Sequence, residues 1–198
     1  MSPTHPVSDP TSISAPGDRA RSIRIALLLL SIALVAILAY TPGLSGGFVF
    51  DDYPNIVDNP LVQPTHAGWS ELVAAALSSP SSDLKRPLSS LTFALDYLIA
   101  GLDAPAMKVT NLGIHVANGL LLFFLLARIV TICRPTATRA RVATAAGAIA
   151  LAWLLLPINL TAVLYIVQRM ESLANLCVLA GLTAYLHARL RMRRIGRG

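Results

Sequence analysis

Charged residues are scarce in this sequence of 198 residues. They make up 13% of the chain, whereas hydrophobic residues make up 55%. Soluble domains carry about 25% charged residues, and the mean hydropathy here is +0.63. This balance excludes an ordinary soluble domain and favours a protein whose solvent is lipid.

Cysteine is rare, and the short motifs of metal and nucleotide chemistry are lacking. The two cysteines are Cys133, in a basic loop, and Cys177, inside an apolar run, so we expect neither a disulfide nor a metal site. No CxxC, HExxH, Walker loop or GxGxxG occurs. The formal net charge is +6, but no basic patch is interleaved with aromatic residues. Nucleic acid is therefore not an expected partner.

Long apolar runs predict about four transmembrane helices, because about 20 apolar residues cross a hydrocarbon core of ~30 Å. The predicted spans are residues 23–42, 109–127, 142–156 and 172–188. Pro157 ends the third span, so a turn or short interfacial helix is expected after it. A cleaved signal peptide is the alternative for the first run, but the long polar lead and the lack of a small-residue cleavage site disfavour it.

The predicted fold class is an all-α membrane protein with a long first extracytoplasmic loop, residues 43–107. Two short interfacial helices are expected in this loop, at about 69–77 and from Pro87 to about Ala100. The chain is predicted to have three parts. A disordered cytoplasmic tail covers residues 1–22, a transmembrane region that includes the loop covers residues 23–190, and a basic cytoplasmic end covers residues 191–198.

Basic residues predict the orientation of the chain. Twelve of the sixteen Lys and Arg residues lie in the N-terminal segment, the loop 128–141 and the C-terminal end, and such an excess marks the cytoplasmic side. Seven of the ten acidic residues lie in the loop 43–107, and Glu171 follows shortly after the expected turn. We therefore expect cytoplasmic termini and a carboxylate site on the extracytoplasmic face.

Asp51 and Asp52 are candidate catalytic residues, because they follow the first span by only a few residues. Repulsion between adjacent carboxylates favours the binding of a proton, and such a group can serve as a general base on a hydroxyl. The two carboxylates could instead bind a divalent cation, although two oxygen donors alone make a poor coordination site. The alternative is a solvated turn in which Asp caps a helix.

Arg86 stands directly before the helix expected from Pro87, where a cation opposes the helix dipole. A bound phosphate would offset this mismatch, and an ordinary contact with lipid headgroups is the alternative. Arg169 and Glu171 begin the fourth span, where Glu171 suits the helix dipole. Arg169 then pairs either with Glu171 or with a phosphate.

His115 and Asn118 share one face of the second span with Asn111. Polar groups at membrane depth are candidates for substrate binding. Hydrogen bonding between helices is the alternative.

Several spaced blocks, taken together, resemble a known family. They lie at residues 48–59, 86–88, 92–97, 101–103, 108–112, 115–118 and 162–174. Together they are similar to the polytopic glycosyltransferases of the C superfamily, which use lipid-linked phosphosugars. The strongest likeness is to the protein O-mannosyltransferase-like members with C-terminal tetratricopeptide repeats, and it covers about residues 25–190.

The resemblance implies a membrane glycosyltransferase of the bacterial inner membrane. Such an enzyme transfers a sugar from a polyprenyl-phosphate donor to a hydroxyl of a protein or glycan acceptor on the extracytoplasmic face. Asp51 or Asp52 then acts as the general base, and Arg86 and Arg169 steady the departing phosphate. Membrane lipid is an implied partner, and no cofactor beyond the lipid-linked donor is implied with certainty.

Two departures from the family pattern support an alternative function. Leu156 stands before Pro157, where the family has a His-Pro pair, and the chain has fewer spans than its relatives. The chain is therefore expected to be a fragment or a truncated member. The alternative is a non-catalytic integral membrane protein that acts as an assembly partner. A third alternative is a transporter fragment, which would need polar residues at mid-membrane depth on several spans. Only the second predicted span shows them clearly, so this alternative is the least favoured.

Overall fold

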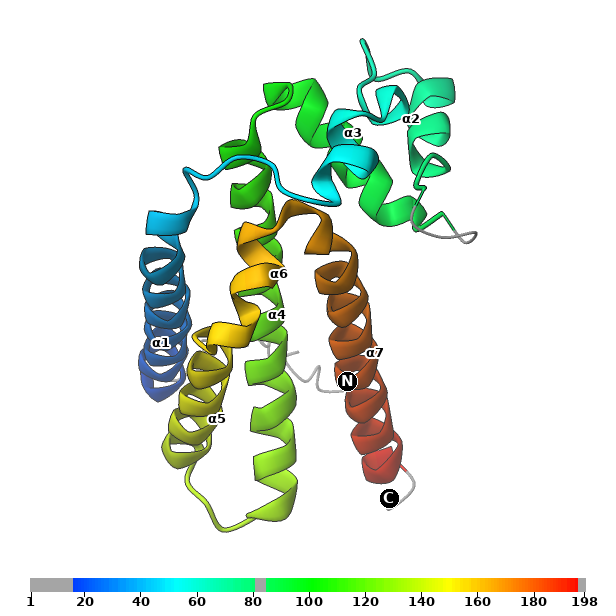
Figure 1. Cartoon of the computed structure of the whole chain (residues 1–198). Coiled ribbons are helices and arrows are strands. Elements are labelled where there is room, and N and C mark those ends of the chain that lie inside the picture. Colours follow the sequence, from blue (N-terminus) through cyan, green and yellow to red (C-terminus); the bar gives the residue numbers. More distant parts are fainter. Residues whose placement is uncertain (1–15, 81–84, 196–198) are drawn as a thin grey trace, which may run out of the picture.

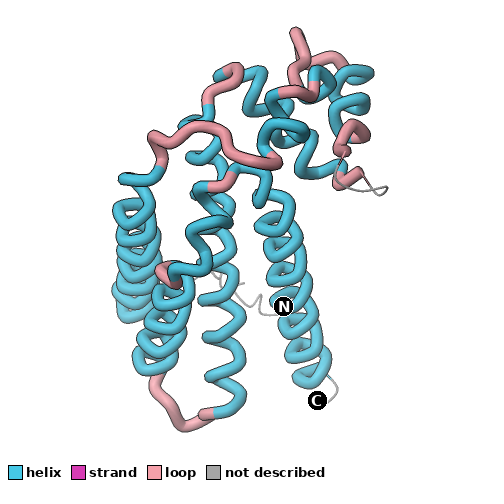
Figure 2. The backbone as a smooth tube through the Cα atoms, in the orientation of Figure 1, coloured by secondary structure: helices cyan, strands magenta, loops and turns pink. Residues whose placement is uncertain are grey.

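The computed structural model describes residues 16–80 and 85–195, which form helices and loops with no strand among them (Figures 1 and 2). Four long helices run side by side. They are α1 (Pro16–Tyr40), α4 (Ala104–Cys133), α5 (Arg139–Leu154) and α7 (Arg169–Ile195). Helix α4 contacts each of the other three and forms the centre of the bundle. The prediction of an all-α fold is confirmed.

Three helical segments are long and apolar enough to cross a membrane: Arg19–Gly43, Ala104–Cys133 and Ile166–Arg193. Helix α5 and the short helix α6 (Leu160–Leu164) meet the same criterion together, but they are bent by 56° at the break between them. The chain is thus a membrane protein with three spans, or four when the bent pair counts as one.

The two ends of the bundle differ in structure and charge. One end, called here the loop end, is covered by α2 (Trp69–Ala76), α3 (Pro87–Ala100) and the short helical turns η2 (Tyr53–Val57) and η3 (Pro60–Val62). The other end, called here the arginine end, holds the starts of α1 and α5 and the C-terminal ends of α4 and α7 (Figure 1). Predicted inner and outer segments therefore separate to opposite ends.

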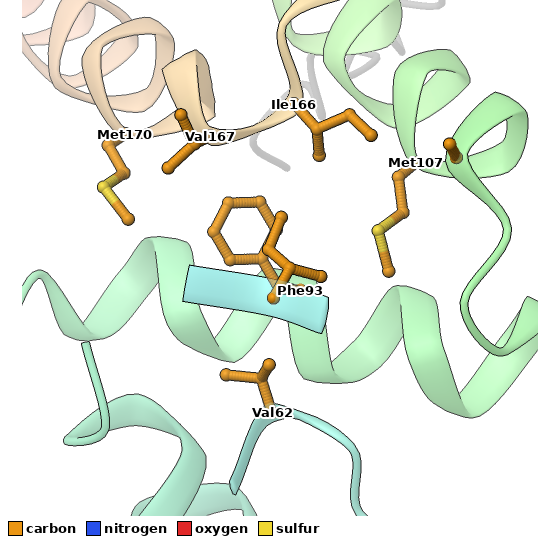
Figure 3. Packing of buried hydrophobic residues seen from close by; sticks show 8 residues of the cluster. Val62, Phe93, Met107, Ile166, Val167 and Met170 are labelled. Atoms are coloured by element: carbon orange, nitrogen blue, oxygen red, sulfur yellow. The ribbon is translucent and has the colours of Figure 1, made fainter. Parts of the chain in front are cut away.

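A buried apolar cluster fastens the loop end to the bundle (Figure 3). Phe93 of α3 lies at its centre, between Val62 of the loop and Met107 of α4. Met170 of α7 and the two residues Ile166 and Val167 of the turn before α7 close it, and Ile56 and Ala104 complete it. Burying a large apolar side chain stabilises a fold by about 1.5–3 kcal/mol, so this cluster holds the loop in a defined position.

Helices α4 and α5 approach closely through small residues. A Cβ atom added to Gly119 would lie 2.6 Å from the side chain of Leu154, which is closer than atoms can pack. On α5, Ala146 and Ala150 are fully buried against the neighbouring helices. Small residues at such crossings are typical of helix packing in membranes.

The break between α5 and α6 occurs at Pro157, which lacks the N–H that would continue the helix. The carbonyl oxygens left by the break find other donors. The Trp153 oxygen accepts a hydrogen bond from Asn159 Nδ2 at 2.6 Å. The Leu154 oxygen accepts one from the Tyr40 hydroxyl at 2.9 Å and lies 3.0 Å from His115 Nε2. Side chains thus satisfy the backbone oxygens that the break leaves without helical partners.

The structure corrects one boundary of the disordered tail predicted at residues 1–22. Residues 1–15 lie outside the described residues, but α1 already begins at Pro16, so the last part of that segment is helical. Proline suits a first helical position, because the N–H it lacks would have no partner there. Helix α4 also extends beyond 109–127 at both ends, and the Asp103 carboxylate caps its start by accepting the Ala106 N–H at 2.8 Å.

Candidate functional site

Asp52 is fully buried at the loop end and holds two chain segments together. Its Oδ2 accepts the Val49 N–H at 3.0 Å, and its Oδ1 accepts the Val167 N–H at 2.7 Å. Burial raises the pKa of the Asp52 carboxyl above its ordinary value, although both hydrogen bonds and the nearby Lys108 charge act in the opposite direction. Asp52 therefore fixes residues 48–59, called here the acidic loop, to the turn Ile166–Gln168 directly before α7.

Lys108 lies beside this carboxylate and is itself buried. Its Nζ donates a hydrogen bond to the Gly46 carbonyl at 2.6 Å. A Cβ atom on Gly46 would lie 2.9 Å from that nitrogen, so glycine permits the close approach. Lys108 thus anchors the chain as it leaves α1, and it balances the buried Asp52 charge.

Asp51 is exposed, in contrast to its neighbour. Its backbone N–H donates to the Tyr165 hydroxyl at 3.0 Å, and its carbonyl accepts the Asn55 Nδ2 hydrogen bond at 2.8 Å. Phe50, with φ of 43°, packs edge-on against the Tyr165 ring. The backbone of Asp51 is therefore fixed while its carboxylate faces the surface.

Tyr165 connects the acidic loop to the segment between α6 and α7. Burial raises the pKa of its hydroxyl, and the hydrogen bond from the Asp51 N–H lowers it. The Asp51 carboxylate raises this pKa further through its charge and a side-chain hydrogen bond, and so does the charge of Asp52. The hydroxyl therefore stays protonated near neutral pH, where it can accept from the Asp51 N–H and also donate.

Arg169 lies wholly inside the protein. Its Nη2 forms an ion pair with Asp96 Oδ2 at 2.6 Å and donates to the Met107 carbonyl at 2.8 Å. Its Nε donates to Asn111 Oδ1 at 2.6 Å, and its guanidinium carbon lies 4.7 Å from the centre of the Phe93 ring. Nη1 has no hydrogen-bond partner within the part of the chain described. These contacts, rather than an open surface, surround the guanidinium.

Arg86 is the predicted cation that reaches the surface of the loop end. It adopts a left-handed conformation with φ of 42° directly before α3. Its Nη1 lies 3.6 Å from Glu171 Oε1 and 3.0 Å from Met170 Sδ. The Arg86 and Glu171 side chains are 41% and 65% exposed, so solvent or a ligand can reach both.

His115 and Asn118 lie deeper in the bundle. His115 lies among Tyr40, Trp153 and the Leu154 carbonyl, and Asn118 Nδ2 donates to the Ser172 carbonyl at 2.9 Å. Both residues join α4 to neighbouring chain segments, as the helix-packing alternative expects. The structure therefore does not bring them to the exposed carboxylate of Asp51.

Three residues of this region were not identified as site residues from the sequence: Lys108, Asp96 and Tyr165. A lone lysine at the head of an apolar run was a usable signal for Lys108, because such a charge needs a partner. Asp96 and Tyr165 carried no signal of their own, since their partners lie far away along the chain.

The arrangement of carboxylates does not fit a cation cage. In the described residues, no group of three or more His, Cys, Asp and Glu side chains could hold a metal ion. Both oxygens of Asp52 accept backbone N–H groups, and a hard cation needs at least six oxygen ligands.

These features define an α-helical membrane protein with an exposed carboxylate held at one end of its bundle. Over 163 residues, or 79% of the chain, it is 34% identical to the protein O-mannosyl-transferase Tmtc2 of Drosophila melanogaster. Over 112 residues, or 52% of the chain, it is 33% identical to a protein O-mannosyl-transferase of Caenorhabditis elegans. The chain is therefore related to the protein O-mannosyl-transferases, as its sequence blocks predicted.

The matched region makes up only a small part of these relatives, 16% of the Drosophila protein and 15% of the Caenorhabditis protein. No protein-family profile matches the chain, and no solved structure matches it.

Proposed function

We propose that this chain forms part of a membrane glycosyltransferase with Asp51 as its general base. The enzyme transfers a sugar from a polyprenyl-phosphate donor to a hydroxyl acceptor on the extracytoplasmic face. The observation that supports the proposal is the pairing of an exposed Asp51 carboxylate with a backbone fixed by Asp52 and Tyr165. The names of the two relatives, both protein O-mannosyl-transferases, supply the reaction class.

The proposed step is a single displacement. The Asp51 carboxylate takes the proton of the acceptor hydroxyl. The hydroxyl oxygen then forms a bond to the anomeric carbon while the bond from that carbon to the donor phosphate oxygen breaks. The phosphate leaves with the bonding electron pair, and the configuration at the sugar carbon inverts. No step passes through a metal ion.

Asp51 is assigned to proton transfer and Asp52 to positioning, because their surroundings differ. Asp52 is enclosed, and both of its oxygens already accept hydrogen bonds. A general base must come within hydrogen-bond reach of the proton that it removes. An acceptor from solution or from the membrane surface can reach Asp51 in this way.

Arg86 is assigned to the departing phosphate in preference to Arg169. Its guanidinium is partly exposed and its contact with Glu171 is long, at 3.6 Å, so a phosphate can compete for it. Arg169 is already held by Asp96, Asn111 and Met107. We assign it to holding α3, α4 and α7 together beneath the site.

The proposal places the loop end outside the membrane and the arginine end in the cytoplasm. Its support is the gathering of basic residues at one end of the bundle. The two relatives are animal proteins, so they give no support for a bacterial membrane. The bacterial inner membrane is therefore part of the proposal only.

The test compares Asp51→Asn with Asp58→Asn in the full gene product. Asp51→Asn should lower sugar transfer by about 100-fold or more while the protein still inserts and folds. Asp58 is exposed in the same loop, so Asp58→Asn serves as the control and should keep full activity. Full activity of Asp51→Asn would exclude Asp51 as the base.

The alternative is a non-catalytic membrane protein that acts as an assembly partner. Leu156, in the place of the family's histidine, is the observation that favours it. It predicts that the full gene product has no transfer activity at all with lipid-phosphate-linked sugars, before any substitution is made.

A further inference from the structure

Two adjoining cavities lie at the arginine end, far from Asp51. The first has a volume of about 600 Å³ and lies between the starts of α1 and α5. The second has a volume of about 530 Å³ and lies between α1, α4 and α5. They share Arg21, Ile25, Arg139 and Ala143 in their linings, so they form two lobes of one hollow.

Several arginines line this hollow. Arg24 and Arg139 line the first lobe, and Arg128 and Arg139 line the second. Arg21 also lines both lobes, but it already has an interaction partner, and the proposal does not depend on it. No carboxylate occurs among the described residues that line either lobe.

The ends of two helices add to this positive potential. Arg139 is the first residue of α5, where the helix dipole already supplies positive charge. The start of α1 lies on the other side of the first lobe. Cations at such positions destabilise a helix unless an anion is near, so the hollow favours a negatively charged group.

The deeper walls of the hollow are apolar. Ile25 and Leu28 of α1 line the first lobe, and Phe123 and Phe124 of α4 line the second. All four belong to helices that meet the length and apolarity criteria for a membrane span. The site therefore combines a cationic rim with an apolar wall that runs into the bilayer.

We propose that this hollow binds an anionic phospholipid of the membrane leaflet at the arginine end. Its phosphate lies between Arg24, Arg128 and Arg139, and its acyl chains lie along Ile25, Leu28, Phe123 and Phe124. Basic pockets between transmembrane helices suit such headgroups. A soluble phosphate would use the guanidinium groups but not the apolar wall. The inference does not depend on Asp51 or on sugar transfer.

The test is lipid retention by the detergent-purified chain in native mass spectrometry. With phosphatidylglycerol and phosphatidylcholine supplied together, the chain should retain phosphatidylglycerol preferentially. Arg24→Gln/Arg139→Gln should weaken this retention about tenfold or more. The matched control is Arg134→Gln/Arg141→Gln, which removes the same charge at the same end but lines neither lobe, and it should retain the lipid.

Equal loss of phosphatidylglycerol in both double variants would overturn the proposal, because only general surface charge would then be at work. Displacement of the lipid by millimolar inorganic phosphate would overturn it as well. A second measurement needs only the wild-type chain, in case a variant does not fold. A photoactivatable phosphatidylglycerol should label peptides that contain Leu28 or Phe124. Labelling confined to α7 or to the loop end would overturn the proposal.

Discussion

The Oδ1 atom of Asp52 lies 2.7 Å from the backbone nitrogen of Val167, a residue 115 positions later in the sequence. This hydrogen bond closes the loop end, because it joins the segment after α1 to the segment before α7. The other carboxylate oxygen of Asp52, Oδ2, accepts a hydrogen bond from the Val49 N–H and so orders the local turn. Asp52 therefore shapes the surface on which Asp51 stands, without being exposed itself.

Asp52→Asn should destabilise the protein by about 1–3 kcal/mol, the usual range for a buried polar group left without a partner. The new amide presents an N–H group where the carboxylate accepted one. Unfolding in detergent, followed by circular dichroism, measures the loss. Asp51→Asn is the matched control and should change stability by less than about 0.5 kcal/mol, because Asp51 is exposed. Equal stability of the two variants would contradict the role of Asp52.

Tyr165→Phe should lower the turnover of sugar transfer up to about tenfold while the affinity for the donor stays unchanged. One hydrogen bond of about 0.5–1.5 kcal/mol to the Asp51 backbone is lost, and the carboxylate is then less well positioned. Steady-state kinetics of the full gene product separate the two parameters. Tyr53→Phe changes an exposed ring in the same loop and should have no effect. A change in donor affinity alone would show that Tyr165 contacts the donor instead.

Asp96→Asn should cost about 3–5 kcal/mol, because it leaves the buried Arg169 guanidinium without its counter-ion. Asp96→Asn/Arg169→Met should recover much of that loss, since it removes both charges. The Arg86–Glu171 pair is the exposed comparison, and Glu171→Gln should cost less than about 1 kcal/mol. Comparable losses at Asp96 and Glu171 would show that Arg169 is hydrated.

Gly119→Ala should destabilise the bundle by about 1–3 kcal/mol, because the new methyl group meets the side chain of Leu154. Leu154→Ala in the same protein should restore part of the lost stability by making room. Gly113 lies on the same helix with no atom within 4 Å of an added Cβ, so Gly113→Ala should be neutral or stabilising. Destabilisation by both substitutions to the same extent would point to the helix backbone rather than to packing against α5.

The orientation is testable by thiol labelling. In a Cys177→Ser background, the exposed Cys133 at the end of α4 is the remaining cysteine. A membrane-impermeant thiol reagent should reach it only after the cells are opened. Ala67→Cys places a thiol in the exposed part of the loop end and should react in intact cells. The reverse pattern would place the arginine end outside.

Local signals predicted much of the architecture. Apolar runs identified the long helices, and Pro87 identified the start of α3, which ends before Gly101 with φ of 68°. These features depend on residues close together in the sequence, where composition and turn chemistry are informative.

The candidate site depended on contacts that no local pattern encodes. Asp51 and Asp52 are adjacent and chemically identical, yet Val167 and Lys108 enclose one of them and leave the other exposed. Likewise, the sequence suggested Glu171 or a phosphate as the partner of Arg169, whereas its partner in the fold is Asp96 of α3. Charges that are satisfied across the fold become visible only once the helices are packed.

The interrupted span at Pro157 also sets a rule for chain length. Only Leu155 and Leu156 separate α5 from the helical turns that follow, and each helical residue turns the chain by about 100°. One residue inserted within these helical turns would rotate the residues that follow, move Val163 out of its packing place and carry Tyr165 away from the acidic loop. Homologous chains should therefore keep a constant spacing between α5 and Tyr165.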